Sequence, residues 1–225
     1  RHPLQTRTMR PNILIIEGPD YTGKSTNAKL VEQQLTTLGH KPIVVRAPGG
    51  SPLGEKLRDV ARNEADSLEE QYLAYLLALV ASKSYIEELV EEGFTVILDR
   101  WSDSLFAYQI AKETNVEKRR LMLEMATSML SFHESIYVRR VILTISPEPL
   151  ERRRAANKAS KDAGDTVDRF DASGASYRAS VIETYARLAE WTPSEGVLGS
   201  FAAIDANSQE DEVSEKLLSF LLRDF

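Results

Sequence analysis

The stretch Gly18-Pro19-Asp20-Tyr21-Thr22-Gly23-Lys24-Ser25 decides the fold, since it matches the pattern G-x-x-x-x-G-K-[ST]. It follows the apolar segment 12–17 (NILIIE) and precedes a helical pattern over residues 23–38. The backbone N–H groups of such a loop curl around phosphate, and the helix N-terminus adds partial positive charge. This context predicts a phosphate-binding loop, in which a solvated Lys24 with little structural role reaches the β- and γ-phosphates and the Ser25 hydroxyl ligates Mg²⁺. The alternative is a Gly-bearing turn with a surface lysine.

Apolar runs alternate with helical patterns along the whole chain. Buried strands are expected at residues 12–17, 42–46, 94–98, 140–145 and 200–204. Helices are expected at residues 23–38, 52–63, 68–92, 103–112, 116–132, 147–156, 171–191 and 209–222, with a polar stretch at 157–166. This alternation predicts an α/β fold with a mostly parallel sheet and helices on both faces. We expect one domain over residues 11–225, preceded by a disordered arm or an added segment at 1–10.

Composition excludes several classes of protein. The 225 residues hold 28 Lys plus Arg and 34 Asp plus Glu, and this net charge of −6 argues against a nucleic-acid partner. The absence of cysteine excludes disulfides, iron–sulfur clusters and thiol catalysis. No apolar run approaches the roughly 20 residues of a membrane helix, and no secretory segment opens the chain. We therefore expect a cytoplasmic protein with no membrane partner.

The third expected strand ends in Asp99-Arg100. Ligands of open α/β folds bind at the carboxyl ends of the strands. We expect Asp99 to hold Mg²⁺ through water and Arg100 to bind the phosphate of an acceptor. The alternative is a structural pair between Asp99 and Arg100.

A basic cluster, Arg152-Arg153-Arg154 followed by Lys158 and Lys161, leads into the polar stretch. These cations can close over a γ-phosphate and stabilise transition-state charge, or they can form a solvated helix face. Three consecutive helical residues point in different directions, so at most one or two of these arginines can face the site. We favour Arg153 as catalytic for its central place among the three.

Five motifs in this order resemble the thymidylate kinases, a family of P-loop nucleoside monophosphate kinases. They are Ile16-Glu17-Gly18-Pro19-Asp20 with Gly23-Lys24-Ser25-Thr26, Arg46-Ala47-Pro48-Gly49-Gly50-Ser51-Pro52-Leu53-Gly54-Glu55-Lys56-Leu57-Arg58, Asp99-Arg100-Trp101 with Ser104 and Ala107-Tyr108-Gln109, Asp168-Arg169-Phe170-Asp171 with Tyr185, and Ile204-Asp205-Ala206. The resemblance implies a five-stranded parallel sheet, a short lid over about residues 152–168 and a homodimer. It also implies phosphorylation of dTMP to dTDP with ATP and Mg²⁺.

The resemblance assigns residues to two substrates. Lys24, Arg100, Arg153 and Asp20 are the expected catalytic residues. The ATP side is expected to comprise Gly18, Tyr21, Thr22, Gly23, Lys24, Ser25, Thr26, Asp205, Ala206 and Asn207. The acceptor side is expected to comprise Asp20, Arg46, Pro48, Leu79, Lys83, Arg100, Trp101, Ser104, Leu105, Tyr108 and Gln109. Tyr21 stands where some members carry a loop arginine, so the chain resembles the lid-arginine type.

The match departs from the family pattern where the base is recognised. Leu79 and Lys83 are our placement of the family's F-x-x-x-R pair, and Tyr72 or Tyr75 is the alternative for base stacking. Trp101 is assigned either to the acceptor site or to the core. Three alternatives remain: a deoxynucleoside monophosphate kinase of altered or broad base choice, a deoxynucleoside kinase with Glu17 as base, and a catalytically inactive nucleotide-binding scaffold.

Overall fold

The computed structural model describes residues 10–160, 174–191 and 201–225. The strands are β1 (Ile13–Glu17), β2 (Pro42–Arg46), β3 (Thr95–Asp99), β4 (Val138–Thr144) and β5 (Phe201–Asp205). The helices are α1 (Lys24–Thr37), α2 (Pro52–Asn63), α3 (Leu68–Glu91), α4 (Ser102–Tyr108), the 3₁₀ turn η1 (Ile110–Lys112), α5 (Val116–Leu130), α6 (Pro147–Ser160), α8 (Ala175–Trp191) and α9 (Glu210–Leu221).

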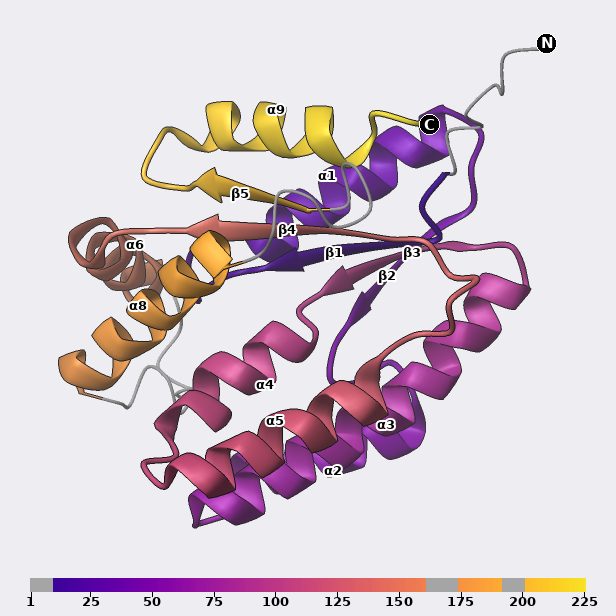
Figure 1. Ribbon diagram of the computed structural model, residues 1–225. Helices are drawn as coiled ribbons and strands as arrows, with labels where there is room; N and C mark the ends of the chain where they lie inside the picture. The colour runs from indigo at the N-terminus through magenta and orange to yellow at the C-terminus, as the bar shows by residue number, and fades with distance from the viewer. Residues whose placement is uncertain (1–9, 161–173, 192–200) are drawn as a thin grey trace, which may run out of the picture.

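The strands form one parallel sheet in the order β2-β3-β1-β4-β5, with β1 at its centre. Every residue of β1 is buried, because Leu14 and Ile16 pack on one face of the sheet and Ile13 and Ile15 on the other. Helices α1 and α9 cover the first face, and α3, α4 and α5 cover the second (Figure 1). The predicted α/β fold with a five-stranded parallel sheet is confirmed.

Several helix boundaries follow signals that the sequence carries. Helix α2 begins after Ser51, whose hydroxyl accepts a hydrogen bond from the Gly54 N–H at 3.0 Å. Helix α3 begins after Ser67, which forms a reciprocal capping box with Glu70. Both starts are where we predicted them, since such caps are local in sequence.

Other boundaries differ from the prediction. Strand β4 begins two residues earlier than expected, and the single helix expected at 103–112 is divided into α4 and η1. Helix α6 extends to Ser160, so the start of the expected polar stretch at 157–166 is helical. The predictions for the arm at 1–9, for Lys161, for the lid beyond Ser160 and for the motif at 168–171 lie outside the described residues.

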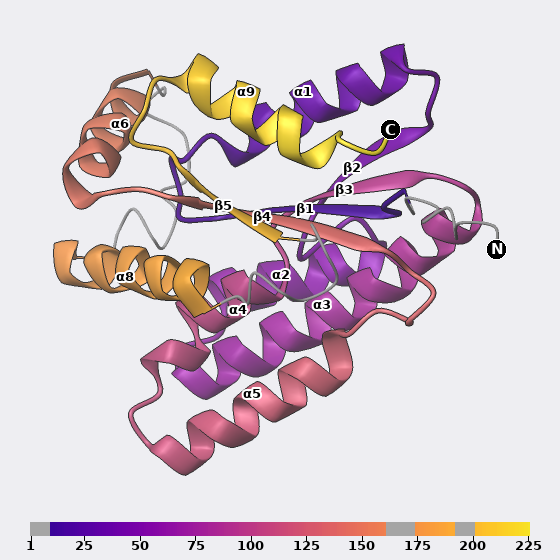
Figure 2. The ribbon, with the colours of Figure 1, turned by 45° about the horizontal axis from the view of Figure 1, so that its top comes forward.

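The segment after β2 is tied to the two helices that follow it. The Gly49 N–H donates to Ser82 Oγ at 2.9 Å, and the Gly50 N–H donates to Glu55 Oε1 at 3.0 Å. A Cβ at Gly54 would lie 3.1 Å from Ser82 Oγ, so α2 packs closely against α3 at this point. Figure 2 shows α2, α3 and α4 together beneath the sheet. This packing builds one wall of the cavity described below.

Candidate active site

The loop between β1 and α1 has the backbone geometry that the G-x-x-x-x-G-K-[ST] pattern demands. Gly18 has φ +145°, and a Cβ there would lie 2.5 Å from the carbonyl oxygen of Leu143. Gly23 precedes α1 with φ +88°, in the left-handed region that glycine tolerates. Tyr21 adopts φ +64° without being glycine, a strained conformation of the kind that clusters at functional sites.

Lys24 is buried rather than solvated, which corrects the prediction made from the sequence. Only 6% of this residue is exposed, and its Nζ donates to the Pro19 carbonyl oxygen at 2.6 Å. Burial and the nearby Arg100 guanidinium lower its pKa to about 8, against the raising effect of Asp20 and Asp99. Lys24 thus has a structural role that the motif alone does not reveal, since its side chain links the start of α1 to the Pro19 carbonyl oxygen of the loop.

Ser25 and Asp99 form a pair of oxygen ligands beside the loop. The Ser25 hydroxyl donates to Asp99 Oδ2 at 2.5 Å, and Asp99 is buried at the end of β3. Mg²⁺ in phosphoryl-transfer sites is typically held by one or two such oxygens together with substrate phosphates and water. The pair therefore fits Mg²⁺ delivered with a nucleotide. No group of three or more His, Cys, Asp or Glu side chains that could hold a metal occurs among the described residues.

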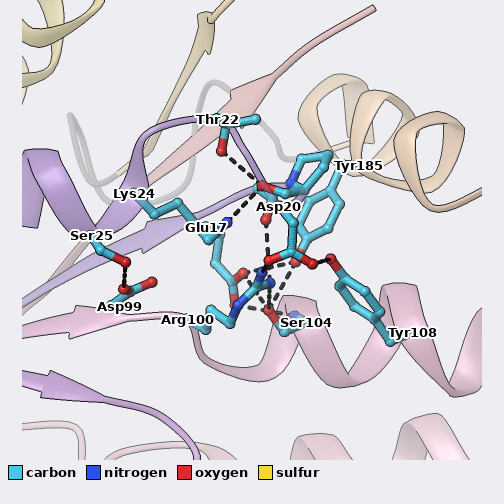
Figure 3. A network of polar contacts seen from close by, with 12 residues as sticks. Glu17, Asp20, Thr22, Lys24, Ser25, Asp99, Arg100, Ser104, Tyr108 and Tyr185 are labelled. Atoms are coloured by element: carbon cyan, nitrogen blue, oxygen red, sulfur yellow. Dashed lines mark hydrogen bonds and ion pairs between the residues drawn. The ribbon is translucent and has the colours of Figure 1, made fainter. Parts of the chain in front are cut away.

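Asp20 and Arg100 form an ion pair across the site (Figure 3). Arg100 also donates to Ser104 Oγ at 3.0 Å and to the Gly18 carbonyl oxygen at 3.3 Å, and it has φ +80°. The Tyr108 hydroxyl donates to the second oxygen of Asp20 at 3.0 Å. Burial opposes ionisation of Asp20, but Arg100 and Lys24 hold the pKa of its carboxyl below the ordinary value. The alternative of a structural pair between Asp99 and Arg100 is wrong, since the carboxylate that pairs with Arg100 is that of Asp20.

Glu17 anchors the first turn of α4 from beneath the loop. Its fully buried carboxylate accepts hydrogen bonds from the Trp101 N–H at 2.5 Å, the Ser104 N–H at 3.1 Å and the Ser104 hydroxyl at 2.8 Å. The Tyr185 hydroxyl, from α8, donates to the same carboxylate at 3.0 Å. Since these bonds hold Glu17 inside the protein, it is poorly placed to act as the base of a deoxynucleoside kinase.

Two cavities meet at Asp20, Arg46 and Arg100, which line both. The cavity on the loop side, here called the donor cavity, is lined by these three and by Tyr21, Gly23, Lys24, Ser25, Thr26, Asp99, Arg153, Ala156, Asn157 and Glu210. The other, here called the acceptor cavity, is lined by the same three and by Ala47, Pro48, Arg58, Arg62, Gln71, Tyr75, Leu79, Trp101, Ser104, Leu105, Tyr108, Gln109 and Tyr177.

Most of the residues assigned to the acceptor side line the acceptor cavity, but Lys83 does not. Lys83 lies outside the lining and forms an ion pair with Glu87 at 3.8 Å, one turn along α3. Tyr75 and Leu79 occupy the cavity wall instead, four residues apart on the same helix. Tyr72 is a core residue whose hydroxyl donates to the Met122 carbonyl oxygen at 2.7 Å. The α3 residues that line the acceptor cavity are thus Gln71, Tyr75 and Leu79, and Lys83 is not among them.

Trp101 lines the acceptor cavity and also belongs to the hydrophobic core, the two positions between which the sequence left the choice open. It lines the acceptor cavity, and its ring stacks on Phe132 with centroids 5.0 Å apart. The residue is only 4% exposed, so one edge of the cavity is made by a core side chain.

On the donor side, Arg153 links the loop to the segment after β5. It donates to the Tyr21 carbonyl oxygen at 3.3 Å and to the Ala206 carbonyl oxygen at 2.8 Å. Arg152 is exposed, and Arg154 pairs with Glu151. Of the three consecutive arginines, Arg153 is thus the one that lines the donor cavity in the described part of the chain.

Five residues assigned to ATP are not part of the donor cavity's lining. These are Gly18, Thr22, Asp205, Ala206 and Asn207. Thr22 donates to the Pro19 carbonyl oxygen at 2.8 Å, and the Asn207 side chain accepts the Ser146 N–H at 2.8 Å. Both side chains therefore fix the loops around the cavity.

Sequence reasoning missed Arg58 and Arg62 of α2, Gln71 of α3 and Tyr177 of α8, all of which line the acceptor cavity. The spacing of four between Arg58 and Arg62 places both on one helix face, and this was the signal available. Glu210, at the start of α9, was missed on the donor side.

Every helix in the described ranges is too short or too polar to span a bilayer.

Comparison with known proteins agrees with the geometry. The family model described as thymidylate kinase matches residues 16–216. A thymidylate kinase from Ralstonia nicotianae is 31% identical over 226 residues, covering 95% of this chain and all of the relative. Thymidylate kinases from Caldanaerobacter subterraneus (31% identity, 84% of this chain and 87% of the relative) and Protochlamydia amoebophila (29% identity, 92% and 91%) are similar as well. This chain therefore belongs to the thymidylate kinase family.

Proposed function

We propose that this protein transfers the γ-phosphoryl group of ATP to the 5′-phosphate of dTMP, yielding dTDP and ADP. A phosphate oxygen of dTMP forms the new P–O bond as the bond between the γ-phosphorus and the β,γ-bridging oxygen breaks. One observation carries the proposal: a phosphate-loop cavity and a second cavity share Asp20, Arg46 and Arg100 at their junction. Family membership names the two substrates.

The donor cavity suits the triphosphate of ATP. Its loop presents backbone N–H groups and the N-terminus of α1, and Lys24 adds a full positive charge when protonated. Ser25 and Asp99 would hold Mg²⁺ with the nucleotide. The ion, when bound, supplies charge neutralisation at the β- and γ-phosphates.

The junction residues suit the reacting phosphates. Arg100 reaches the acceptor phosphate from the end of β3, while its pairing with Asp20 fixes the guanidinium before substrate binds. Arg46 lines both cavities and can therefore stabilise negative charge on the donor phosphates and on the acceptor phosphate. Arg153 extends from α6 over the phosphate loop and contributes charge on the donor side. Phosphoryl transfer depends on such positioning and charge stabilisation rather than on a protein nucleophile.

The rest of the acceptor cavity suits a deoxynucleoside. Tyr75, Leu79 and Leu105 offer an aromatic face and apolar walls to the base. Tyr108 lines the same cavity and is held by its hydrogen bond to Asp20, and its proposed role is to disfavour a ribose 2′-hydroxyl by steric contact.

The test compares two acceptors that differ by one phosphate. Purified protein with ATP and Mg²⁺ should release ADP with dTMP and not with thymidine, because Arg46 and Arg100 have no anion to bind in the nucleoside. Equal or faster ADP release with thymidine would assign the protein to the deoxynucleoside kinases and overturn the proposal.

We also propose that the protein forms a homodimer. Large apolar side chains are exposed on α3 (Leu73, 55%, and Leu77, 52%) and on α5 (Met125, 45%, and Met129, 51%). Two pairs at a spacing of four make apolar stripes on neighbouring helices, a pattern typical of subunit interfaces. Light scattering after size exclusion should give twice the chain mass of 25.2 kDa, and the double variant Leu73→Glu/Leu77→Glu should give the monomer. A monomeric native protein would refute the dimer.

A further inference from the structure

Arg100 has a backbone conformation that its residue type does not favour. Its φ of +80° lies in the left-handed region, which residues other than glycine rarely adopt. The residue stands between the end of β3 at Asp99 and the start of α4 at Ser102, so the chain leaves the sheet at this point. The direction of the Arg100 side chain therefore depends on the contacts that hold this turn in place.

Two neighbouring residues of β1 hold the peptide groups on either side of Arg100. The Arg100 N–H donates to the Ile16 carbonyl oxygen at 3.0 Å, which continues the pairing of β1 with β3. The next N–H along the chain, that of Trp101, donates to Glu17 Oε1 at 2.5 Å. The first contact is made by the backbone of β1 and the second by a side chain. Glu17 thus supplies the acceptor that the sheet no longer offers.

The same carboxylate orients the hydroxyl group that contacts the Arg100 guanidinium (Figure 3). Glu17 Oε2 accepts hydrogen bonds from the Ser104 hydroxyl at 2.8 Å and from the Tyr185 hydroxyl at 3.0 Å. A carboxylate only accepts, so Ser104 donates its single hydroxyl proton to Glu17. The Ser104 oxygen is then left to accept from Arg100 Nη1, which lies 3.0 Å away. Glu17 therefore holds both the backbone and the side chain of Arg100.

Glu17 does all of this without contact with a substrate. Its side chain is fully buried, and it is not among the described residues that line either cavity. Burial of a carboxylate is costly unless its oxygens are hydrogen-bonded, and here each oxygen accepts two hydrogen bonds. An effect of Glu17 on catalysis must therefore pass through the residues that it holds.

We propose that Glu17 is a positioning residue for phosphoryl transfer, which holds Arg100 in its left-handed conformation and directs the guanidinium to the junction of the two cavities. The role depends on an acceptor oxygen at this place more than on its charge, because two of the four donors are backbone N–H groups and two are hydroxyls. This inference rests on the proposed function, in which Arg100 binds the acceptor phosphate.

Two substitutions separate the reach of the Glu17 side chain from its charge. Glu17→Gln keeps the length and one acceptor oxygen and loses the charge, whereas Glu17→Asp keeps the charge and withdraws it by one C–C bond, about 1.5 Å. We expect kcat/KM for dTMP to stay within about tenfold of wild type in Glu17→Gln and to fall about 100-fold in Glu17→Asp, the scale of a misplaced charge donor. KM for ATP should change less than about threefold in both variants, since Lys24 and the start of α1 are untouched.

A double variant tests whether the effect passes through Arg100. Glu17→Asp/Arg100→Ala should be no more than about threefold slower than Arg100→Ala, because no guanidinium is left to position. The matched control is Asp224→Asn, which changes a carboxylate to an amide where Asp224 pairs with Arg139 near the start of β4, away from the carboxyl ends of the strands. It should lower the midpoint of thermal unfolding and leave kcat and both KM values unchanged.

Higher activity in Glu17→Asp than in Glu17→Gln would show that the charge matters more than the reach, and would overturn the inference. Losses that multiply in the double variant would do the same, because they would assign Glu17 a role independent of Arg100. If Glu17→Asp does not fold, Glu17→Gln decides alone, since a loss of more than about tenfold overturns the inference. These results leave the proposed function standing, because wild-type turnover of dTMP is measured in the same series. A wild-type protein that does not phosphorylate dTMP would instead refute the proposed function itself.

Discussion

Replacing Arg100 by alanine removes the side chain that joins the two cavities. The guanidinium donates to Ser104 Oγ at 3.0 Å and to the Gly18 carbonyl oxygen at 3.3 Å, forms the ion pair with Asp20 and lies 5.3 Å from the centroid of the Tyr108 ring. In the variant, the Asp20 carboxylate keeps Tyr108 and the nearby Lys24 as partners. We therefore expect the substitution to weaken binding of the acceptor phosphate more than it lowers the stability of the fold.

The expected losses can be ranked by size. Because the Asp20 side chain is 32% exposed, solvent screens the broken ion pair, and we expect stability to fall by only about 1–2 kcal/mol. Removing one donor that stabilises transition-state charge typically costs about 2.7–4 kcal/mol, or 100- to 1,000-fold in rate. We therefore expect Arg100→Ala to lower kcat/KM for dTMP by two to three orders of magnitude while the protein remains folded.

Steady-state kinetics with each substrate varied in turn separates the two sides of the site. KM for dTMP should rise and kcat should fall, whereas KM for ATP should change little, since Lys24 and the α1 N-terminus remain. Arg120→Ala is a matched control, because this exposed arginine pairs only with Glu117 and Glu124 among the described ion pairs. If KM for ATP rises by the same factor while that for dTMP is unchanged, the assignment of the two cavities is reversed.

Three further predictions concern single side chains. Since the pKa of Lys24 is lowered to about 8, the side chain loses its charge in the free enzyme as pH rises through that value. Above that pH, kcat/KM for ATP should therefore fall about tenfold per pH unit. This decline should be absent in Lys24→Arg, and a decline that persists there would show that another group titrates. Arg153→Ala should lower kcat about 100- to 1,000-fold. The control is Arg152→Ala, which removes an exposed arginine and should retain most of the rate. Equal losses in the two variants would show that the arginines act through their summed charge and not through one positioned side chain. Tyr108→Ala should lower the ratio of kcat/KM for dTMP to that for its ribonucleotide at least tenfold. Tyr108→Phe keeps the ring and loses only the hydrogen bond to Asp20, so this ratio should be unchanged. A ratio that falls in Tyr108→Phe and not in Tyr108→Ala would show that the hydroxyl, and not the ring, selects the sugar.

Sequence alone predicts the parts of this site that depend on neighbours along the chain. The loop from Gly18 to Ser25 needs specific backbone angles, and those angles need specific residues, so the motif predicts the geometry. The starts of α2 and α3 are predicted for the same reason, because Ser51 and Ser67 cap the helices that they precede. Fully buried strands such as β1 are predicted by their unbroken apolar runs.

The failures come from contacts between segments far apart in the chain. Lys83 was assigned to the base site by counting residues along α3, whereas the α3 residues that line the cavity are Gln71, Tyr75 and Leu79. Arg62 was missed because its spacing of four from Arg58 shows only that the two share a helix face, and not that this face lines a cavity. The burial of Lys24 and the partner of Arg100 likewise depend on how β3 and the phosphate loop meet.

The central claim is that the two cavities hold ATP and dTMP so that the γ-phosphoryl group passes between them. Following the reaction by ³¹P NMR tests it most directly, since the signals of donor and product are observed together. With ATP, dTMP and Mg²⁺, the γ-phosphate signal of ATP should disappear as the α- and β-phosphate doublets of dTDP and ADP appear, with no inorganic phosphate. Loss of the γ-phosphate signal with release of inorganic phosphate, and no dTDP, would mean that water is the acceptor and would contradict the account.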